Sequence, residues 1–402
     1  MSVPNFISQS LGVFKDLTDI SIEVKKINPF NGQSFSAAGT REITFKLPRD
    51  KILLGTNSYF YFKAKPDADS AADDEFQNDI HTCFDRHTVK VGSQTVVEEN
   101  EFGWWRSLEF LAKASESDLT SASTTVMNIP DNSISGVAKK YRIPLASKWN
   151  NKGFFSQPLP LYKMDQVEIT YEINSSIAEY TTATTAVGTV DITVPELELY
   201  FIDSPTLRKL FDVDLVRNFR TFFHYHSVLT SGATQLSVNI PASFQNLRGL
   251  AMIQRNSATS SDPNWETGND ALENLKYCKS FLLNSLTKFD VSVDGKPYPS
   301  TPIDGSNAVE LVSNLERFWG NADRLGAWFD SDTMTATNGK GYYAISFSAD
   351  DDNVSGLNSA SKTGTIVVRA DLTVGVNTDV DFFVVYDRFY KISKNGDISV
   401  TK

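Results

Sequence analysis

Hydrophobic and polar side chains alternate along much of this chain, as they do in β-strands that bury one face. In REITFKLPRD, residues 41–50, Ile43, Phe45 and Leu47 fall on one side of an extended backbone, polar residues fall on the other, and Pro48 ends the run. Alternation with a period of two predicts a half-buried strand here.

The same phrase occurs a second time, half a chain later. QLSVNIPASF, residues 235–244, again places three aliphatic side chains on one face and closes with a proline. Leu236 follows Ile43 by 193 positions, and Pro241 follows Pro48 by the same 193, in a chain of 402 residues. A fixed offset of this size indicates an internal duplication.

The first half contains strand-like runs in a definite order, with one helix among them. A hairpin is expected around Gly92-Ser93, and a short helix follows it, because Phe102, Trp105 and Leu108 recur at helical spacing. Strand, strand, hairpin, helix and three strands are predicted at 41–50, 58–65, 87–97, 101–112, 141–146, 166–173 and 195–202.

The second half repeats this order. Its hairpin is expected around Asp294-Gly295, and the helix after it has Val309, Val312, Leu315 and Trp319 on its predicted apolar face. The corresponding segments are 216–229, 235–240, 248–255, 288–298, 307–319, 341–349, 364–374 and 379–392.

Two all-β halves of similar size predict two packed sandwiches, because 402 residues exceed what a single core normally supports. One helix after a hairpin in each half favours the jelly roll among sandwich types. The predicted fold is all-β, with two tandem eight-stranded jelly rolls, each carrying a short helix and long loops. The predicted divisions are an N-terminal arm at 1–20, a first roll at 21–205 and a second roll at 206–402.

Composition and charge exclude several classes of protein. The net charge of −11 leaves no basic field to hold phosphates, so direct nucleic-acid binding is not expected. No apolar run approaches the roughly 20 residues of a membrane span, and a secretory signal is absent, so we expect a soluble protein. The arm at 1–20 is either a short amphipathic helix or a loosely packed terminus. Cys83 and Cys278 lie in opposite halves, which favours reduced thiols over a disulfide bridge.

Two polar clusters could bind metal ions, and each has an alternative interpretation. His224 and His226 form an H-x-H on one face of a strand, where they could bind zinc or copper with a third ligand, or pack against Phe222 and Tyr225. The run Asp350 to Asp352 could hold calcium, but it lacks EF-hand spacing and is typical of a solvated turn. We therefore predict no metal site.

Aromatic residues raise the same choice. Trp104, Trp105 and Trp319 could form a ligand-binding platform, or they could anchor a helix in a core or an oligomer interface, which is the favoured interpretation.

Catalytic and nucleotide-binding motifs are missing from the sequence. It contains no nucleophile elbow, no H-E-x-x-H, no Walker loop and no G-x-G-x-x-G. The chain has four histidines, at 81, 87, 224 and 226, so few candidates exist for acid–base catalysis. We predict that the protein is not an enzyme and has no catalytic residues and no cofactor.

Five segments together resemble one protein family. These are 42–66, an amphipathic strand followed by an aromatic one; 88–112, a hairpin followed by a helix; 141–173, two strands around a PLPL approach; and their echoes at 222–255 and 285–299. Their order is similar to that of double jelly-roll major capsid proteins, the lineage of tectivirus-like phages, adenovirus-like and polinton-like viruses, virophages and their giant relatives.

The resemblance implies a function in assembly. A family member would be a major capsid protein in the virion of a double-stranded DNA virus, soluble in the host cell before assembly. Its homotrimer would form a pseudo-hexameric capsomer of an icosahedral capsid. Implied partners are its own copies, neighbouring capsomers, minor capsid or penton proteins, and an internal membrane reached by the arm at 1–20, without sequence-specific nucleic-acid contacts. Loops at 113–140, 175–190, 256–276 and 320–340 would face outward or clasp a neighbour.

Two alternatives stay open from the sequence. The chain could be another virion component, such as a penton, spike or minor capsid protein. It could also be a tandem β-sandwich carbohydrate-binding protein, which would need exposed aromatic rings on a sheet.

Overall fold

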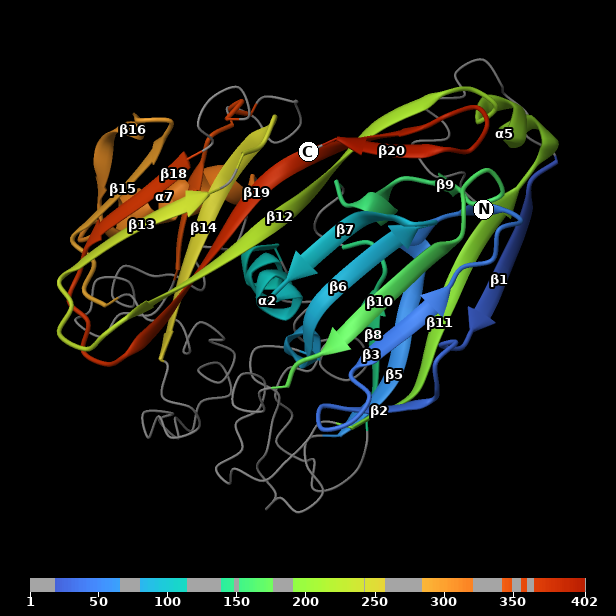
Figure 1. Cartoon of the computed structure of the whole chain (residues 1–402), viewed down its shortest axis with the longest axis horizontal. Helices are drawn as coiled ribbons and strands as arrows, with labels where there is room; N and C mark the ends of the chain where they lie inside the picture. The colour runs from blue at the N-terminus through green and yellow to red at the C-terminus, as the bar shows by residue number, and fades with distance from the viewer. Residues whose placement is uncertain are drawn as a thin grey trace.

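The chain folds as two β-sandwiches side by side. The computed structural model describes residues 19–65, 80–113, 139–147, 152–175, 191–241, 243–256, 284–320, 342–348, 356–359 and 365–401. Their strands form four antiparallel sheets, two in each sandwich (Figure 1). The predicted all-β class is confirmed.

The first sandwich is built from strands β1 to β11. One sheet has the order β8-β5-β11, with β1 and β2 also paired to β11 and with β4 and β9 at its end, and the other has the order β3-β10-β6-β7. The elements are β1 (Ser21–Ile27), β2 (Ser34–Ser36), β3 (Glu42–Lys46), β4 (Ile52–Leu53), β5 (Tyr59–Lys65), the 3₁₀ turn η2 (Ile80–Cys83), β6 (Phe84–Val91), β7 (Gln94–Asn100), α2 (Phe102–Lys113), β8 (Lys139–Pro144), β9 (Leu159–Pro160), β10 (Val167–Ile173) and β11 (Asp191–Asp203).

The second sandwich follows the short helix α5 (Pro205–Leu210). Its sheets have the orders β12-β19-β14-β17, with β20 also paired to β19, and β13-β18-β15-β16. The elements are β12 (Leu215–Leu229), β13 (Gln235–Pro241), β14 (Leu247–Asn256), β15 (Lys288–Val293), β16 (Lys296–Asp304), α7 (Ala308–Trp319), β17 (Tyr343–Ser346), β18 (Thr365–Asp371), β19 (Thr378–Ile392) and β20 (Ile398–Thr401).

The two sandwiches have the same topology. The order β1-β11-β5-β8 in the first corresponds to β12-β19-β14-β17 in the second, and β3-β10-β6-β7 corresponds to β13-β18-β15-β16. Each set of eight strands pairs in the jelly-roll pattern, and α2 and α7 occupy the same connection, after the hairpin. The duplicated phrase in the sequence therefore forms two equivalent strands, β3 and β13. The domain limits at 20/21 and 205/206 stay a prediction.

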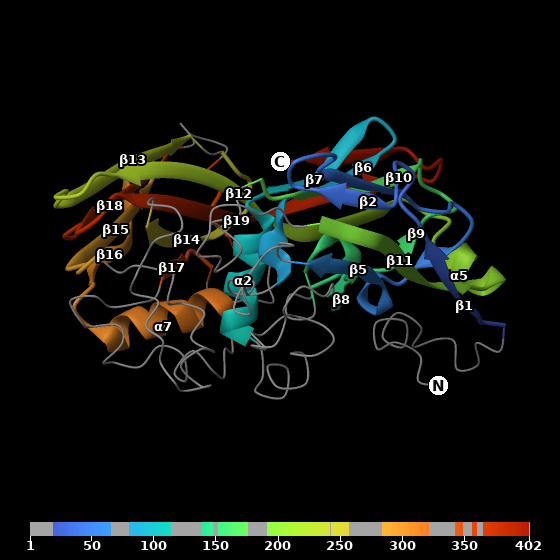
Figure 2. The same ribbon diagram turned by 90° about the horizontal axis from the view of Figure 1, so that it is seen from below.

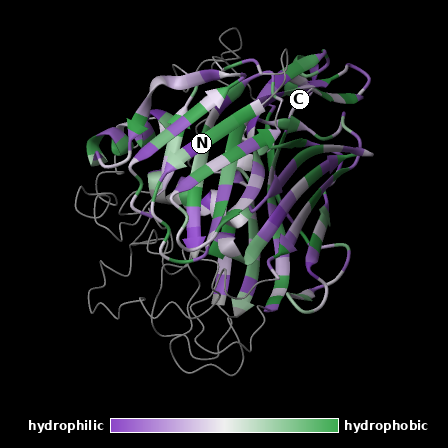
Figure 3. Cartoon of the chain, turned by 60° about the vertical axis from the view of Figure 1, so that its left-hand side comes forward, coloured by the Kyte–Doolittle hydropathy of each residue, from purple (hydrophilic) through white to green (hydrophobic). Residues whose placement is uncertain are grey.

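Hydrophobic and hydrophilic residues alternate along the strands (Figure 3), and the buried hydrophobic residues form a core in each sandwich. In β10, every second side chain from Val167 to Ile173 is buried, and Tyr171 stacks on Phe60 of the facing sheet with ring centroids 4.7 Å apart. On the outer face, Glu172 of β10 forms an ion pair with Arg86, with 2.8 Å between Oε2 and Nη2. The amphipathic strand predicted at 166–173 is confirmed.

Both predicted hairpin turns are present. Gly92 has a φ of 58° between β6 and β7, and Asp294 and Gly295 have φ values of 51° and 78° between β15 and β16. Two consecutive positive φ values are the geometry of a type I′ turn, which Asp-Gly adopts readily.

One helical face differs from its prediction, which was wrong. The expected stripe on α7 begins at Val309, but that side chain is 73% exposed, and Asn307 caps the helix just before it. The buried stripe instead runs through Ala308, Leu311, Leu315 and Trp319, so the phase of the first turn differs. The physical reason is that apolar spacing alone does not say which side of the first turn faces the sheet.

Candidate functional site at the junction of the two rolls

Helix α2 belongs to the first roll but packs into the core of the second. Figure 2 shows it between the two sandwiches. The Trp105 ring lies 4.9 Å from Phe222 of β12, 5.6 Å from Phe383 of β19 and 5.2 Å from Trp319 of α7, measured between centroids. Its side chain is 4% exposed. The helix therefore joins the two cores.

The second roll also contributes to the core of the first. Phe219 of β12 and Tyr390 of β19 pack against Phe154, with ring centroids 5.5 Å and 5.3 Å away. These two strands pair over fifteen residues and run from the second roll across to the first (Figure 1). The rolls are thus joined by an exchange of aromatic side chains in both directions.

Polar contacts cross the same boundary and fix its geometry. Arg388 of β19 donates from Nη1 to the Val96 carbonyl of β7 at 2.6 Å, and Arg217 of β12 donates to the Pro158 carbonyl at 2.8 Å. Hydrogen bonds from a charged donor typically contribute about 1.5–3 kcal/mol. Their directionality sets the relative orientation of the rolls, which apolar packing alone does less strictly.

A buried carboxylate lies at the centre of the boundary. Glu99 of β7 accepts a hydrogen bond from the Thr221 hydroxyl of β12 at 3.2 Å, lies 3.1 Å from His87, and has Arg106 at 3.9 Å. Burial would raise the pKa of Glu99, but the hydrogen bond from His87 and the charge of Arg106 bring it below its usual value. Glu99 is therefore ionised, and it links a strand of each roll.

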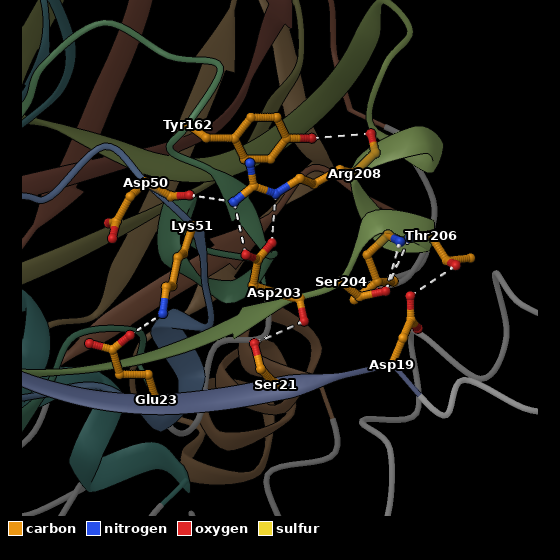
Figure 4. Close-up of polar contacts among 11 residues, drawn as sticks. Asp19, Ser21, Glu23, Asp50, Lys51, Tyr162, Asp203, Ser204, Thr206 and Arg208 are labelled. Atoms are coloured by element: carbon orange, nitrogen blue, oxygen red, sulfur yellow. Dashed lines mark hydrogen bonds and ion pairs between the residues drawn. The ribbon is translucent and has the colours of Figure 1, made fainter.

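The linker between the rolls is held to the first roll by Arg208 of α5. Its guanidinium forms a two-pronged ion pair with Asp203, at 2.6 and 2.8 Å, and donates to the Asp50 carbonyl at 2.8 Å (Figure 4). The guanidinium carbon also lies over the face of the Tyr162 ring, 4.8 Å from its centroid. Bidentate geometry makes this a strong contact for a half-buried pair.

The start of β1 is attached at the same place. The Ser204 hydroxyl caps α5 by accepting from the backbone N–H groups of Thr206 and Leu207, and the Thr206 hydroxyl donates to Asp19 at 3.2 Å (Figure 4). The first described residues of the chain are therefore anchored to the linker. Residues 1–18 of the predicted arm lie outside the described residues.

The two histidines considered as metal ligands pair with aspartates. His224 Nε2 lies 2.9 Å from Asp381, which also accepts two hydrogen bonds from Arg255, and the exposed His226 lies 3.3 Å from Asp379. The His224 ring packs near Phe383, at 5.5 Å, across the strand pair. Within the described residues, no group of three or more His, Cys, Asp or Glu side chains is arranged to hold a metal ion.

Asp381 of β19 is a second buried acid whose pKa is lowered. Burial would raise its pKa, but the charge of Arg255 and the hydrogen bond with His224 lower it to about 2. The carboxylate is thus charged at all ordinary pH values, and it ties β12 and β14 to β19.

The candidate tryptophans and Cys83 are all buried. Since Trp104, Trp105 and Trp319 lie in the core, the predicted packing role is confirmed and the three rings form no exposed platform. That Cys83 and Cys278 are both reduced thiols stays a prediction. Cys278 and Asp350 to Asp352 lie outside the described residues. In the described part of the chain, no helix is both long enough and apolar enough to cross a bilayer.

Several solved structures share this architecture over nearly their whole length. The PBCV-1 virus capsid model is 11% identical and has a TM-score of 0.63, covering 97% of this chain and 99% of that one. The mavirus major capsid protein is 11% identical with a TM-score of 0.53, covering 100% and 95%. The Faustovirus major capsid protein is 10% identical with a TM-score of 0.53, covering 94% and 91%.

The chain has the double jelly-roll fold. The resemblance seen in the sequence is confirmed at this level, since these structural neighbours are double jelly-roll major capsid proteins. No protein-family model and no curated protein matches the sequence. The double jelly-roll fold is therefore recognised from the three-dimensional structure and its strand order, at a sequence identity near one residue in ten.

Sequence reasoning missed the junction itself. Glu99, Thr221 and Arg388 stand in ordinary strand patterns, and nothing in the local sequence marks them as contacts between rolls. Only the Trp104-Trp105 pair indicated a contact outside the first roll. Two large rings on one short helix are more than the helix can bury against a single sandwich.

Proposed function

We propose that this chain is a major capsid protein that acts by self-assembly in a virion. The support is the double jelly-roll fold, shared over nearly the full length with capsid proteins of PBCV-1, mavirus and Faustovirus. On this proposal the protein is a structural component and not an enzyme.

The observation that carries the proposal is the equivalence of two rolls that pack against each other. Each roll has the same strand order, and the shared aromatic core and charged contacts hold them as one body. Three such chains around a threefold axis would present six similar wedges, so a homotrimer could occupy a position with six neighbours. A closed ring of repeated heterologous contacts is how such a unit forms.

Equivalent edges of the two rolls offer the surfaces for these contacts. β1 and β12 occupy the same position in their sheets, and among the described strands each is paired on one side only, to β11 and β19 respectively. Both expose aliphatic side chains: Ile22 and Val24 on β1, and Val216 and Val228 on β12. Open edges with apolar side chains are places where another chain can bind.

Further partners follow from the same proposal. Neighbouring capsomers and minor capsid or penton proteins would contact the rim of the trimer, and the segment before β1 would reach an internal membrane. Another virion component is the remaining structural alternative. The carbohydrate-binding alternative has lost the aromatic platform it needed, because the three candidate tryptophans are buried.

The native mass of the purified full-length protein tests the proposal. We expect about 134 kDa by light scattering, three times the chain mass of 44.7 kDa, and three-lobed or hexagonal outlines in negative stain. The variants Val24→Asp and Val216→Asp should reduce the mass toward that of a monomer. Val309→Asp is the matched control, because that valine is exposed on α7, away from both edges, and an acid suits a first helical turn.

Two results would contradict the proposal. A wild-type protein that stays monomeric at micromolar concentration, or that forms pentamers, would exclude the trimeric capsomer. A trimer that survives both edge substitutions would leave the trimer in place but refute β1 and β12 as its contact surfaces.

A further inference from the structure

The two equivalent sheets differ in how their outer faces are covered. In β19 of the second roll, the eight consecutive residues from Val380 to Asp387 are all buried. In β11, which holds the same position in the first roll, burial alternates from Pro195 to Phe201. A strand that buries every residue is covered on both faces, whereas an alternating strand is covered on one. Within the described residues, the second roll therefore has a cover on this sheet that the first roll lacks.

Two helices provide the cover on the second roll. Trp105 of α2 packs on Phe383 of β19, with 5.6 Å between ring centroids. Phe318 of α7 lies so close to Gly249 of β14 that a Cβ at that glycine would meet its ring. In Figure 2, α7 lies below β14 and β17, on the side away from β13. The outer face of this sheet has thus become part of a hydrophobic core.

The first roll presents a different surface in the same position. Strand register places the outward side chains of β1, β11, β5 and β8 on one continuous face, where they are half-buried or exposed. Eight of these residues, two tyrosines, four cations and two carboxylates, define what we call the tyrosine face. They are Tyr59, Tyr61, Lys26, Lys63, Lys140, Arg142, Glu196 and Glu198.

Cations hold the two rings of the tyrosine face in place. The ring centroids of Tyr59 and Tyr61 are 6.2 Å apart, and the guanidinium carbon of Arg142 lies 4.5 Å from the Tyr59 centroid. The Nζ atoms of Lys140 and Lys26 lie 5.1 and 5.7 Å from the Tyr61 centroid. Side chains fixed in this way lose little conformational entropy when a partner binds. Tyrosine and arginine are also among the residue types enriched in protein–protein interfaces.

The tyrosine face is positively charged on an acidic chain. Its four cations and two carboxylates give it a charge of +2, whereas the whole chain has a net charge of −11. Lys26 forms an ion pair with Glu196 at 3.0 Å, so the excess positive charge lies on β5 and β8. Complementary charge favours an acidic partner and speeds its association. Every further copy of this chain is such a partner.

We propose that the tyrosine face binds an acidic surface of a second copy of this chain. The inference rests on the proposed function, because it names one surface used in self-assembly. Val24 lies on the same side of β1 as Lys26, so the tyrosine face continues into the exposed apolar edge of that strand. The second copy would cover the sheet of the first roll, as α2 and α7 cover that of the second.

Lysine acetylation of the wild-type, full-length protein maps the covered face, with N-hydroxysuccinimide acetate as reagent and peptide mass spectrometry as readout. Lys63 and Lys140 belong to the tyrosine face, whereas Lys90 of β6 is exposed on the other sheet of the same roll and serves as the internal reference. In the assembled protein, we expect Lys63 and Lys140 to lose most of their labelling relative to Lys90. Dilution until the protein dissociates should restore it.

Two variants test which groups bind the second copy. Tyr61→Ala removes the ring on which Lys26 and Lys140 stack, and Lys140→Glu reverses an exposed charge. Each should raise the concentration at which half of the protein is assembled by about tenfold or more, measured by sedimentation equilibrium. Lys90→Glu is the matched control, because it makes the same change in net charge on the other sheet, and it should assemble like the wild type. If Tyr61→Ala does not fold, Lys140→Glu still decides the question.

Several outcomes would overturn the inference. If Lys63 and Lys140 are labelled as fast as Lys90 in the assembled protein, no second copy covers the face, while the proposed function still stands. A protein that stays monomeric contradicts the inference and the proposed function together. Unchanged assembly of both Tyr61→Ala and Lys140→Glu would refute the inference alone. So would heparin binding by the assembled wild type that Lys140→Glu abolishes, because the face would then be open to an anionic glycan.

Discussion

Replacing Trp105 by alanine is the most direct test of the junction between the rolls. The side chain is 4% exposed and contacts three aromatic rings of the second roll, at 4.9 to 5.6 Å between centroids. Truncating a buried tryptophan typically costs about 3–5 kcal/mol. Each aromatic pair contributes about 0.5–1.5 kcal/mol beyond simple burial. With three such pairs, we expect a loss of about 4 kcal/mol.

Urea unfolding followed by far-ultraviolet circular dichroism measures this loss. Because Trp105 is on the first roll and its partners are on the second, we also expect the unfolding of the two rolls to separate into two transitions. A double-mutant cycle with Phe222→Ala should show a coupling of about 0.5–1.5 kcal/mol between the two rings.

Phe223→Ala is the matched control for this experiment. It lies beside Phe222 on β12 but is 36% exposed, so its loss should cost much less. The reasoning is refuted if Trp105→Ala costs less than about 1 kcal/mol, or no more than Phe223→Ala.

Three further predictions follow from the structure, two of them with a matched control. Gly103→Ala should lower the Tm in thermal unfolding, because a Cβ at this position of α2 would collide with the backbone of the 3₁₀ turn η2. This loss should outweigh the advantage of about 1 kcal/mol that alanine has over glycine in a helix. Gly375→Ala is the control, and it should leave the Tm nearly unchanged because the space around Gly375 is open. Leu315→Ala should cost about 2–5 kcal/mol in urea unfolding, whereas Val309→Ala should be nearly neutral, and the reverse order would restore the predicted phase of the α7 face. The pKa of Asp381 is lowered to about 2 in the folded protein, against roughly 3.9 when unfolded, so its ion pairs stabilise the fold above pH 4 and lose roughly 2 kcal/mol as the pH falls toward 2. Asp381→Asn should show a weaker loss of urea midpoint between pH 5 and pH 2.5, and an unchanged slope would count against this account.

Much of the fold could be predicted because its determinants are local. The alternation in β10 and the turn residues Gly92 and Asp294-Gly295 each specify a conformation within a few residues. The repeat at an offset of 193 residues then indicated two equivalent units. The error at Val309 has the same origin, because a one-residue change in helical phase alters little in the local pattern while it decides which side chain meets the sheet.

The sequence by itself determined the strands, the turns and the duplication, since periodicity and turn chemistry act between neighbours along the chain. Only the tertiary structure decided that α2 serves the core of the other roll, and that Arg388 donates to a carbonyl 292 residues away. It also brought Glu99 to Thr221. The physical reason is that the strength of these contacts depends on burial and distance. Both quantities arise when the two rolls pack together, and neither is encoded in the spacing of residues along a single strand.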